Sequence, residues 1–202
     1  MNIKPILENI VSDNTLHAKW LNTLSYMENA GAKKISASED KENVNLIILK
    51  HAAEEHRHAY YLKKQLDKLD GNLCKTYTNA ELLTPNNTKF YLNALDVSVC
   101  RYLKEQFNLS GSELKFAAYL FVTYAIEVRA DELYPIYQEI LTESRSKVNV
   151  KSIILEEEGH LEEMLNQLKT FSADWEKHAE VVIAIEQQMF NDWISALGKL
   201  IA

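Results

Sequence analysis

Very few residues in this chain can interrupt a helix. Its 202 residues include only 5 glycines and 3 prolines, and hydrophobic residues make up 47% of the sequence. Glycine and proline weaken helices most, whereas leucine, alanine, glutamate and lysine favour them and are abundant here. Alternating apolar and polar runs, which half-buried strands require, are scarce. The sequence therefore predicts an all-α protein built from long helices.

Apolar residues recur at helical spacing in successive segments that turn residues separate. At this length one compact domain over residues 1–202 is expected, with a core bundle at about 14–170 and a C-terminal helix at about 172–198. The helices are expected at about residues 14–35, from Ser36 or Ser38 to Asp70-Gly71, 85–107, 110–141, 147–169 and 172–197.

Two local signals refine these boundaries. Ser110 and Glu113 have the spacing of a capping box, so the fourth helix is expected to begin there. Pro135 lies inside the same segment and lacks a backbone N–H. It is therefore expected to kink or break that helix.

The word Glu-Glu-x-x-His occurs twice, each time inside a helical segment. In the first copy Glu55 precedes His58 by three residues, and in the second Glu157 precedes His160 by three. Residues at this spacing lie on one face of a helix. The sequence thus offers two pairs of candidate metal ligands.

Two further glutamates complete a known ligand pattern. A dinuclear site in a helical bundle takes one Glu from each of two helices and Glu-x-x-His from each of two others. Glu28 lies in the first expected bundle helix, and Glu127 follows a very apolar run at residues 116–126. Four buried carboxylates are tolerable when two divalent cations balance them. Oxygen and imidazole donors without cysteine suit iron or manganese.

With these residues in place, the chain resembles the ferritin-like superfamily of di-iron and di-manganese carboxylate proteins over about residues 14–169. The resemblance implies a ferritin-like four-helix bundle with a helical crossover and an additional C-terminal helix. It implies that Glu55 and Glu157 bridge the two metals. The terminal ligands it implies are Glu28, His58, Glu127 and His160.

Three residues near the ligand pairs are candidates for supporting contacts: His51, Tyr124 and Asp131. His51 shares a helical stripe with Glu55 and can equally be a capped or core histidine. Tyr124 stands one turn before Glu127 and can equally be a core tyrosine. Asp131, one turn after Glu127, can equally be a surface residue.

The other charged residues of the two words are expected outside the ligand set. Glu54 and Glu156 lie about 100° around the helix from the ligand face, so ion pairs are expected, with Glu54 joined to Arg57. A solvated face is expected for Glu158, Glu162 and Glu163.

Composition excludes several other classes of protein. The net charge of −7 and the lack of a basic stripe argue against nucleic-acid binding. The N-terminal residues lack a signal-peptide pattern, and no apolar run approaches membrane-spanning length, so a soluble cytoplasmic protein without membrane contact is expected. Cys74 and Cys100 fit no metal or redox word and are expected to be ordinary thiols. We expect a homodimer.

These features favour a protein that binds two Fe ions, with two Mn ions or a mixed Mn/Fe pair as alternatives. The expected function is an oxidoreductase that uses O2 to oxidise or oxygenate a small-molecule substrate. Three alternatives remain: non-enzymatic iron handling, a helical interaction protein, and manganese-dependent peroxide disproportionation. Helical heme-oxygenase-like proteins are a weaker alternative, because the duplicated Glu-x-x-His is the ferritin-like arrangement.

Overall fold

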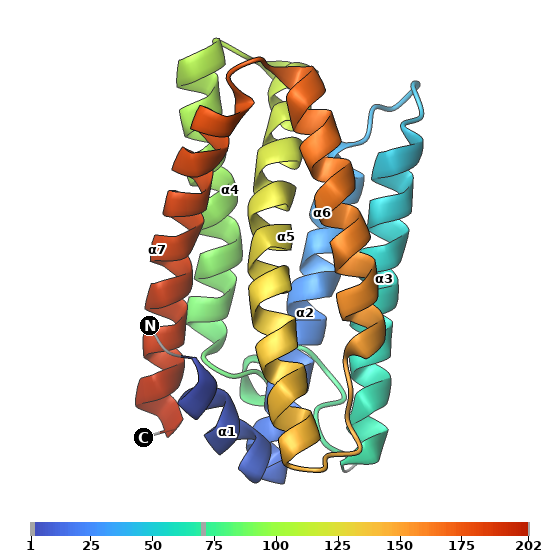
Figure 1. Cartoon of the computed structure of the whole chain (residues 1–202), viewed down its shortest axis with the longest axis vertical. Coiled ribbons are helices and arrows are strands. Elements are labelled where there is room, and N and C mark those ends of the chain that lie inside the picture. Colours follow the sequence, from blue (N-terminus) through green and yellow to red (C-terminus); the bar gives the residue numbers. More distant parts are fainter. Residues whose placement is uncertain (1–2, 70–71, 202) are drawn as a thin grey trace.

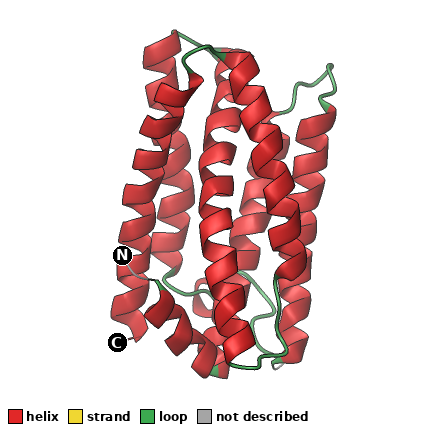
Figure 2. Cartoon of the chain, viewed as in Figure 1, coloured by secondary structure: helices red, strands yellow, loops and turns green. Residues whose placement is uncertain are grey.

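The computed structural model describes residues 3–69 and 72–201, and all regular structure in these residues is helical (Figure 2). The prediction of an all-α protein is confirmed. Within the described residues the α-helices are α1 (Lys4–Ser12), α2 (Asn14–Ser38), α3 (Leu46–Gln65), α4 (Pro85–Phe107), α5 (Gly111–Glu143), α6 (Lys151–Phe171) and α7 (Trp175–Ile201), with short 3-10 helices η1 (Leu66–Lys68) and η2 (Asn79–Glu81).

The long helices run alongside one another and alternate in direction from α2 to α7 (Figure 1). Helices α2 and α3 pack as one hairpin and α5 and α6 as another, while α4 and α7 pack together against α5. The short helix α1 crosses one end of the assembly and contacts α2, α5 and α7 (Figure 1). Helix α5 is therefore the central element, with neighbours on several sides.

The first part of the chain differs from the expected helices at several points. Helix α1 was not expected, and α2 continues to Ser38 instead of ending near Ile35. The next helix begins at Leu46, because the Asn45 side chain accepts hydrogen bonds from the Ile47 and Ile48 backbone N–H groups. The expected cap at Ser36 or Ser38 is thus wrong. The expected stop at Asp70-Gly71 lies outside the described residues.

Helix α5 also departs from its two local signals. Ser110 immediately precedes the helix, but its side chain accepts no capping hydrogen bond, so the expected capping box is absent. Pro135 lies within the helix, which continues unbroken to Glu143. Pro135 has no N–H to donate to the carbonyl of Asp131, which lies four residues earlier. Asp131 is exposed. The missing hydrogen bond thus falls on an exposed residue, and the helix is not broken there.

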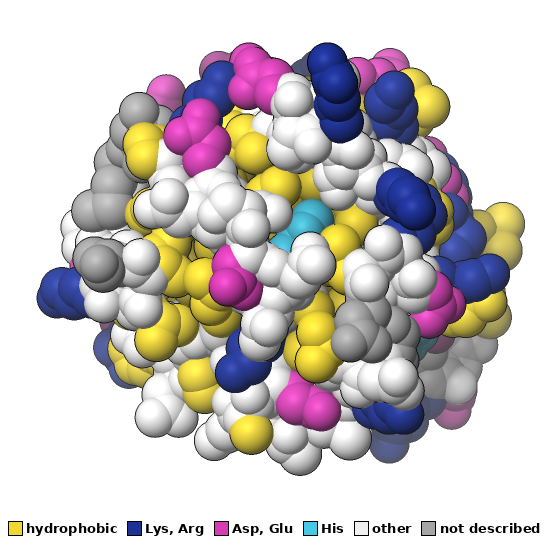
Figure 3. All heavy atoms as spheres, turned by 90° about the horizontal axis from the view of Figure 1, so that it is seen from below, with side chains coloured by type: hydrophobic (Ala, Val, Ile, Leu, Met, Phe, Trp, Pro, Cys, Tyr) yellow, Lys and Arg dark blue, Asp and Glu magenta, His cyan; other side chains and the backbone are white. Residues whose placement is uncertain are grey.

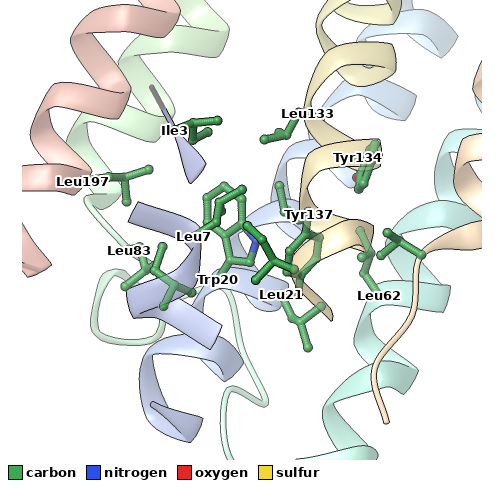
Figure 4. Packing of buried hydrophobic residues seen from close by; sticks show 14 of the residues in the cluster. Ile3, Leu7, Trp20, Leu21, Leu62, Leu83, Leu133, Tyr134, Tyr137 and Leu197 are labelled. Carbon is green, nitrogen blue, oxygen red and sulfur yellow. The ribbon is translucent and has the colours of Figure 1, made fainter. Parts of the chain in front are cut away.

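The apolar core consists of two clusters that occupy different levels along the helices. One contains the aromatic side chains of Trp20 and Tyr137 near α1 (Figure 4), and Trp193 belongs to the same cluster. In this cluster the Trp20 and Trp193 rings stack with centroids 5.7 Å apart. The other cluster lies toward the opposite end and includes Phe121 and Val182.

The predicted ligand residues lie between these two clusters on each helix that carries them. On α3, for example, Ala52 belongs to the second cluster and Leu62 to the first, with Glu55 and His58 between them. The same order holds for α2, α5 and α6. A polar layer is thereby sealed on both sides by apolar packing.

Two observations describe the outer surface: the character of the helices and the mixture of side chains on one end face. None of the helices in the described residues has the length and apolar character needed to cross a bilayer. On the end face seen from below, basic and acidic side chains are interspersed with apolar ones (Figure 3).

Candidate metal centre

The structure brings all six predicted ligand residues together inside the protein. One group comprises Glu28, Glu55, His58 and Glu157, and the other comprises Glu55, Glu127, Glu157 and His160. Within each group the candidate ligand atoms lie within 4.8 Å of one another. Glu55 and Glu157 belong to both groups. The arrangement can therefore hold two cations side by side, with these two carboxylates between them.

Four helices supply the six side chains. Helices α3 and α6 each contribute one Glu and one His from the same face, as the spacing of three residues requires. Helices α2 and α5 contribute Glu28 and Glu127 respectively. Glu28 is half-buried, and the other five side chains are buried.

The inward nitrogen of His58 is suited to bind a metal. Its Nδ1 atom is buried and makes no hydrogen bond, although it lies 3.1 Å from Oε1 of Glu157 and 3.8 Å from Oε2 of Glu55. With its proton removed, this buried nitrogen would face only carboxylate oxygens, which cannot donate a hydrogen bond to it. A metal ion bound to these carboxylates would give that nitrogen a partner, so the donor set fits a cation.

The second histidine has the matching position. Nδ1 of His160 lies 3.1 Å from Oε2 of Glu157, 3.6 Å from Oε1 of Glu55 and 3.7 Å from Oε1 of Glu127. The His58 and His160 rings have centroids 5.9 Å apart. Both histidines thus direct the same ring nitrogen toward the four carboxylates.

The outer nitrogens of the two histidines face carboxylates from the opposite helix. Nε2 of His58 on α3 lies 3.0 Å from Oε2 of Glu156 on α6, and Nε2 of His160 on α6 lies 2.8 Å from Oε2 of Glu54 on α3. Such a carboxylate fixes the protonated nitrogen and the orientation of a metal-binding imidazole. Arg57 pairs with Glu156, so the expected ion pair of Glu54 with Arg57 is wrong. The extra Glu before each Glu-x-x-His was the sequence signal for these contacts.

His51 supports the site from outside both ligand groups. Its ring lies 4.8 Å from that of His160 between centroids, and the side chain is fully buried. Nε2 of His51 lies 2.9 Å from Oε2 of Glu163, and Nδ1 lies 2.9 Å from the Tyr119 hydroxyl. Glu163 also pairs with Lys50, so it is not a freely solvated residue as expected.

The other two candidates for supporting contacts lie elsewhere. Tyr124 packs edge-on against Trp175, with centroids 6.3 Å apart, and Asp131 is exposed. Neither makes a hydrogen bond to a ligand residue in the described part of the chain. Tyr134, which was not predicted, donates a hydrogen bond from its hydroxyl to Oε1 of Glu28.

Burial and charge repulsion distribute protons unevenly over the carboxylates. Burial raises the pKa of Glu28 and of Glu127 well above the usual range, and the neighbouring carboxylates raise both pKa values further. Burial would also raise the pKa of Glu157, but contacts with Glu127, His160 and His58 lower it instead. Some carboxyl groups therefore hold protons when no cation is bound.

The two histidines also favour protonation in the metal-free protein. Burial alone would lower the pKa of His58, but contacts with Glu157 and Glu55 raise it to about 10. His160 follows the same pattern, and Glu157 with Glu54 and Glu55 raises its pKa to about 9. Protons thus partly compensate the carboxylate charge, and cations would have to displace them.

A cavity of about 540 Å³ adjoins the carboxylate side of the site. It lies between α2, α4 and α5 and is lined by Glu28, Glu55 and Glu127 at its inner end. The described lining does not include His58 or His160. A molecule in this cavity would therefore approach the cluster from the side opposite the histidines.

No family model, curated protein or solved structure matches this chain. Its class is therefore defined by its own fold and site. It is an all-α protein in which four glutamates and two histidines converge between two apolar clusters.

Proposed function

We propose that this protein is a ferritin-like dinuclear metal protein that uses O2 to oxidise or oxygenate a small molecule. In this proposal α2, α3, α5 and α6 form the metal-binding four-helix bundle, and α4 belongs to the crossover. The observation that carries it is the pair of overlapping ligand groups that share Glu55 and Glu157.

The donor chemistry favours two ferrous ions. Four carboxylates and two imidazoles offer hard and intermediate ligands, and neither cysteine contributes to the ligand groups. Two divalent cations would balance four ionised carboxylates, which makes the buried charge acceptable. Two Mn ions or a mixed Mn/Fe pair satisfy the same donors and are the alternatives.

A bound iron pair would supply the electrons that reduce O2. The chain's own residues would hold the metals and keep both imidazoles oriented through Glu54 and Glu156. The two apolar clusters would limit the access of water along the helices from either end. Tyr134 would hold the Glu28 carboxyl in position through its hydroxyl.

The adjoining cavity favours an enzyme over an iron-handling protein. A substrate must reach the metals, and an apolar space beside the ligands would hold it there. A metal site used only for storage or structure has no need of such a space. The cavity touches Glu28, Glu55 and Glu127 and is otherwise mostly apolar. Its volume is within the range of roughly 300–1,000 Å³ that is typical of small-molecule sites.

The reaction with O2 tests this function. Protein loaded with Fe(II) without oxygen and then exposed to air should oxidise its iron rapidly and develop a transient visible absorption. A matched sample of Glu157→Ala should show neither change, while Glu158→Ala, which alters an exposed neighbour, should behave as the wild type. Wild-type iron that stays ferrous in air would contradict the proposal.

Metal analysis separates the alternatives. Two Mn ions with release of O2 from peroxide would support peroxide disproportionation instead. Bound iron without turnover would support iron handling, and a protein that binds no metal would support a helical interaction protein.

A further inference from the structure

The cavity beside the site also carries information about the substrate. Its inner end is formed by Glu28, Glu55 and Glu127, and the rest of its wall comes from α2, α4 and α5. Most of that wall is apolar, including Leu24, Leu95, Val122, Ile126 and Leu133. A ligand in this space would therefore touch apolar groups along most of its length.

Three charged side chains of the wall, those of Lys34, Asp96 and Arg129, are already paired. Lys34 of α2 forms an ion pair with Asp96 of α4 and donates a 2.7 Å hydrogen bond to the Leu92 carbonyl. Arg129 is held by Glu186, with N–O distances of 3.0 Å from Nε and 2.8 Å from Nη2. These charges are therefore not available to a charged ligand.

The one remaining cation of the described lining is peripheral. Lys115 is exposed on the first turns of α5, so water solvates its ammonium group. A charged group that lies against this wall would lose its hydration and find no free partner in the wall, which is costly. An uncharged apolar group would gain from leaving water.

Gly31 helps to keep the cavity open. It lines the wall on α2, and a Cβ atom added there would meet no atom within 4 Å. Larger side chains at this position would project into free space. Gly159 on α6 provides a matched position, since its added Cβ also meets nothing, but this glycine is exposed and does not line the cavity.

We propose that the cavity selects an uncharged, mainly apolar small molecule and presents it to the carboxylate side of the metal pair, between Glu28 and Glu127. The orientation rests on the proposed function, because it requires metals at the cluster. The selection rests on the cavity wall alone and can be tested separately.

Binding of three molecules with the same chain length tests the selection. Decanol is uncharged, decanoate is an anion and decylamine is a cation at neutral pH. Calorimetry on metal-loaded protein without O2 should show decanol binding at least about tenfold more tightly than either charged molecule. Gly31→Leu should weaken decanol binding at least about tenfold, and Gly159→Leu should leave it unchanged.

Other results would overturn the inference. Decanoate or decylamine binding as tightly as decanol would show that the cavity accepts charge. Absence of decanol binding, or unchanged binding in Gly31→Leu, would show that the cavity is not the binding site.

Metal content measured on the same samples separates this proposal from the proposed dinuclear function. Decanol binding without bound metal would leave the selection intact and remove the dinuclear function, whereas two metals without decanol binding would do the reverse.

Discussion

Nε2 of His58 lies 3.0 Å from Oε2 of Glu156, a carboxylate that belongs to the facing helix α6. The reciprocal contact joins His160 of α6 to Glu54 of α3. Each Glu-Glu-x-x-His word thus supplies one candidate ligand pair and one carboxylate that orients the histidine of the other word. The two copies of the word therefore support each other's histidine in the structure.

Removing one of these outer carboxylates should weaken metal binding without removing a ligand. Loss of such a partner typically lowers metal affinity by roughly 10–100-fold. Glu54→Ala should therefore bind Fe(II) or Mn(II) about 10–100-fold more weakly in a chelator competition. Glu158→Ala, on the exposed face of α6, is the control. Equal affinities in Glu54→Ala and the wild type would show that the contact does not support the site.

The hydrogen bond from Tyr134 to Glu28 should stabilise the folded protein. Tyr134→Phe removes the hydroxyl that hydrogen-bonds this carboxyl group, at a cost of about 1 kcal/mol in the free energy of unfolding. Urea denaturation of the metal-free protein measures this change. Tyr124→Phe is the control, because Tyr124 lies against Trp175 and away from the ligands. A Tyr134→Phe variant as stable as the wild type would contradict the predicted role.

Acid should destabilise the protein through His17. This side chain is buried and its Nε2 lies 2.6 Å from the Tyr137 hydroxyl. Burial lowers the pKa of His17 to about 4, so the unfolded chain binds a proton more readily than the folded protein. The stabilisation is complete above the unfolded pKa of about 6.5 and is lost as the pH falls toward 4, by up to about 3 kcal/mol.

Comparison with a His17→Gln variant isolates that contribution. Urea denaturation of metal-free samples at several pH values between 4 and 7 should show a smaller loss of stability in His17→Gln than in the wild type. Parallel curves for the two proteins would show that His17 does not titrate as its burial requires.

Metal binding should release protons. Glu28 and Glu127 have raised pKa values, and His58 and His160 have pKa values of about 10 and about 9 without metal. Bound cations need ionised carboxylates and neutral imidazoles, so metal affinity should rise with pH below this range. Calorimetric titrations in buffers of different ionisation enthalpy measure the protons released. Binding with no proton release would contradict the metal-free charge state described here.

The parts of the site that depend only on local spacing could be predicted from the sequence. Residues three apart share a helix face regardless of what surrounds the helix, so Glu55 with His58 could be paired without a structure. The contacts of Glu54 and Glu156 with the histidines could not be predicted from the sequence, because they depend on how α3 and α6 are rotated toward one another.

Helical periodicity distinguishes Tyr134 from Tyr124 in the sequence. Tyr124 is three residues from Glu127 and lies about 60° around the helix from it. Tyr134 is seven residues away, so it lies only about 20° from the same direction. Periodicity alone therefore favours Tyr134 as the tyrosine that faces the ligand layer. The hydrogen bond to Glu28 agrees with that position.

The helix ends were less predictable for a different reason. Asn45 and Ser38 are both able to cap a helix, and only the path of the chain between α2 and α3 determines which one does. The apolar core that surrounds the ligand layer likewise joins residues far apart in the sequence, such as Trp20 and Trp193.

Metal stoichiometry tests the central claim most directly. Purified protein saturated with Fe(II) or Mn(II) without O2 and freed of excess ions should retain two metals per chain, because two ligand groups overlap at Glu55 and Glu157. Glu55→Ala and Glu157→Ala should each lose most of this metal while Glu158→Ala retains it. A wild-type protein that retains no metal, or variants at Glu55 and Glu157 that retain two, would contradict the dinuclear site.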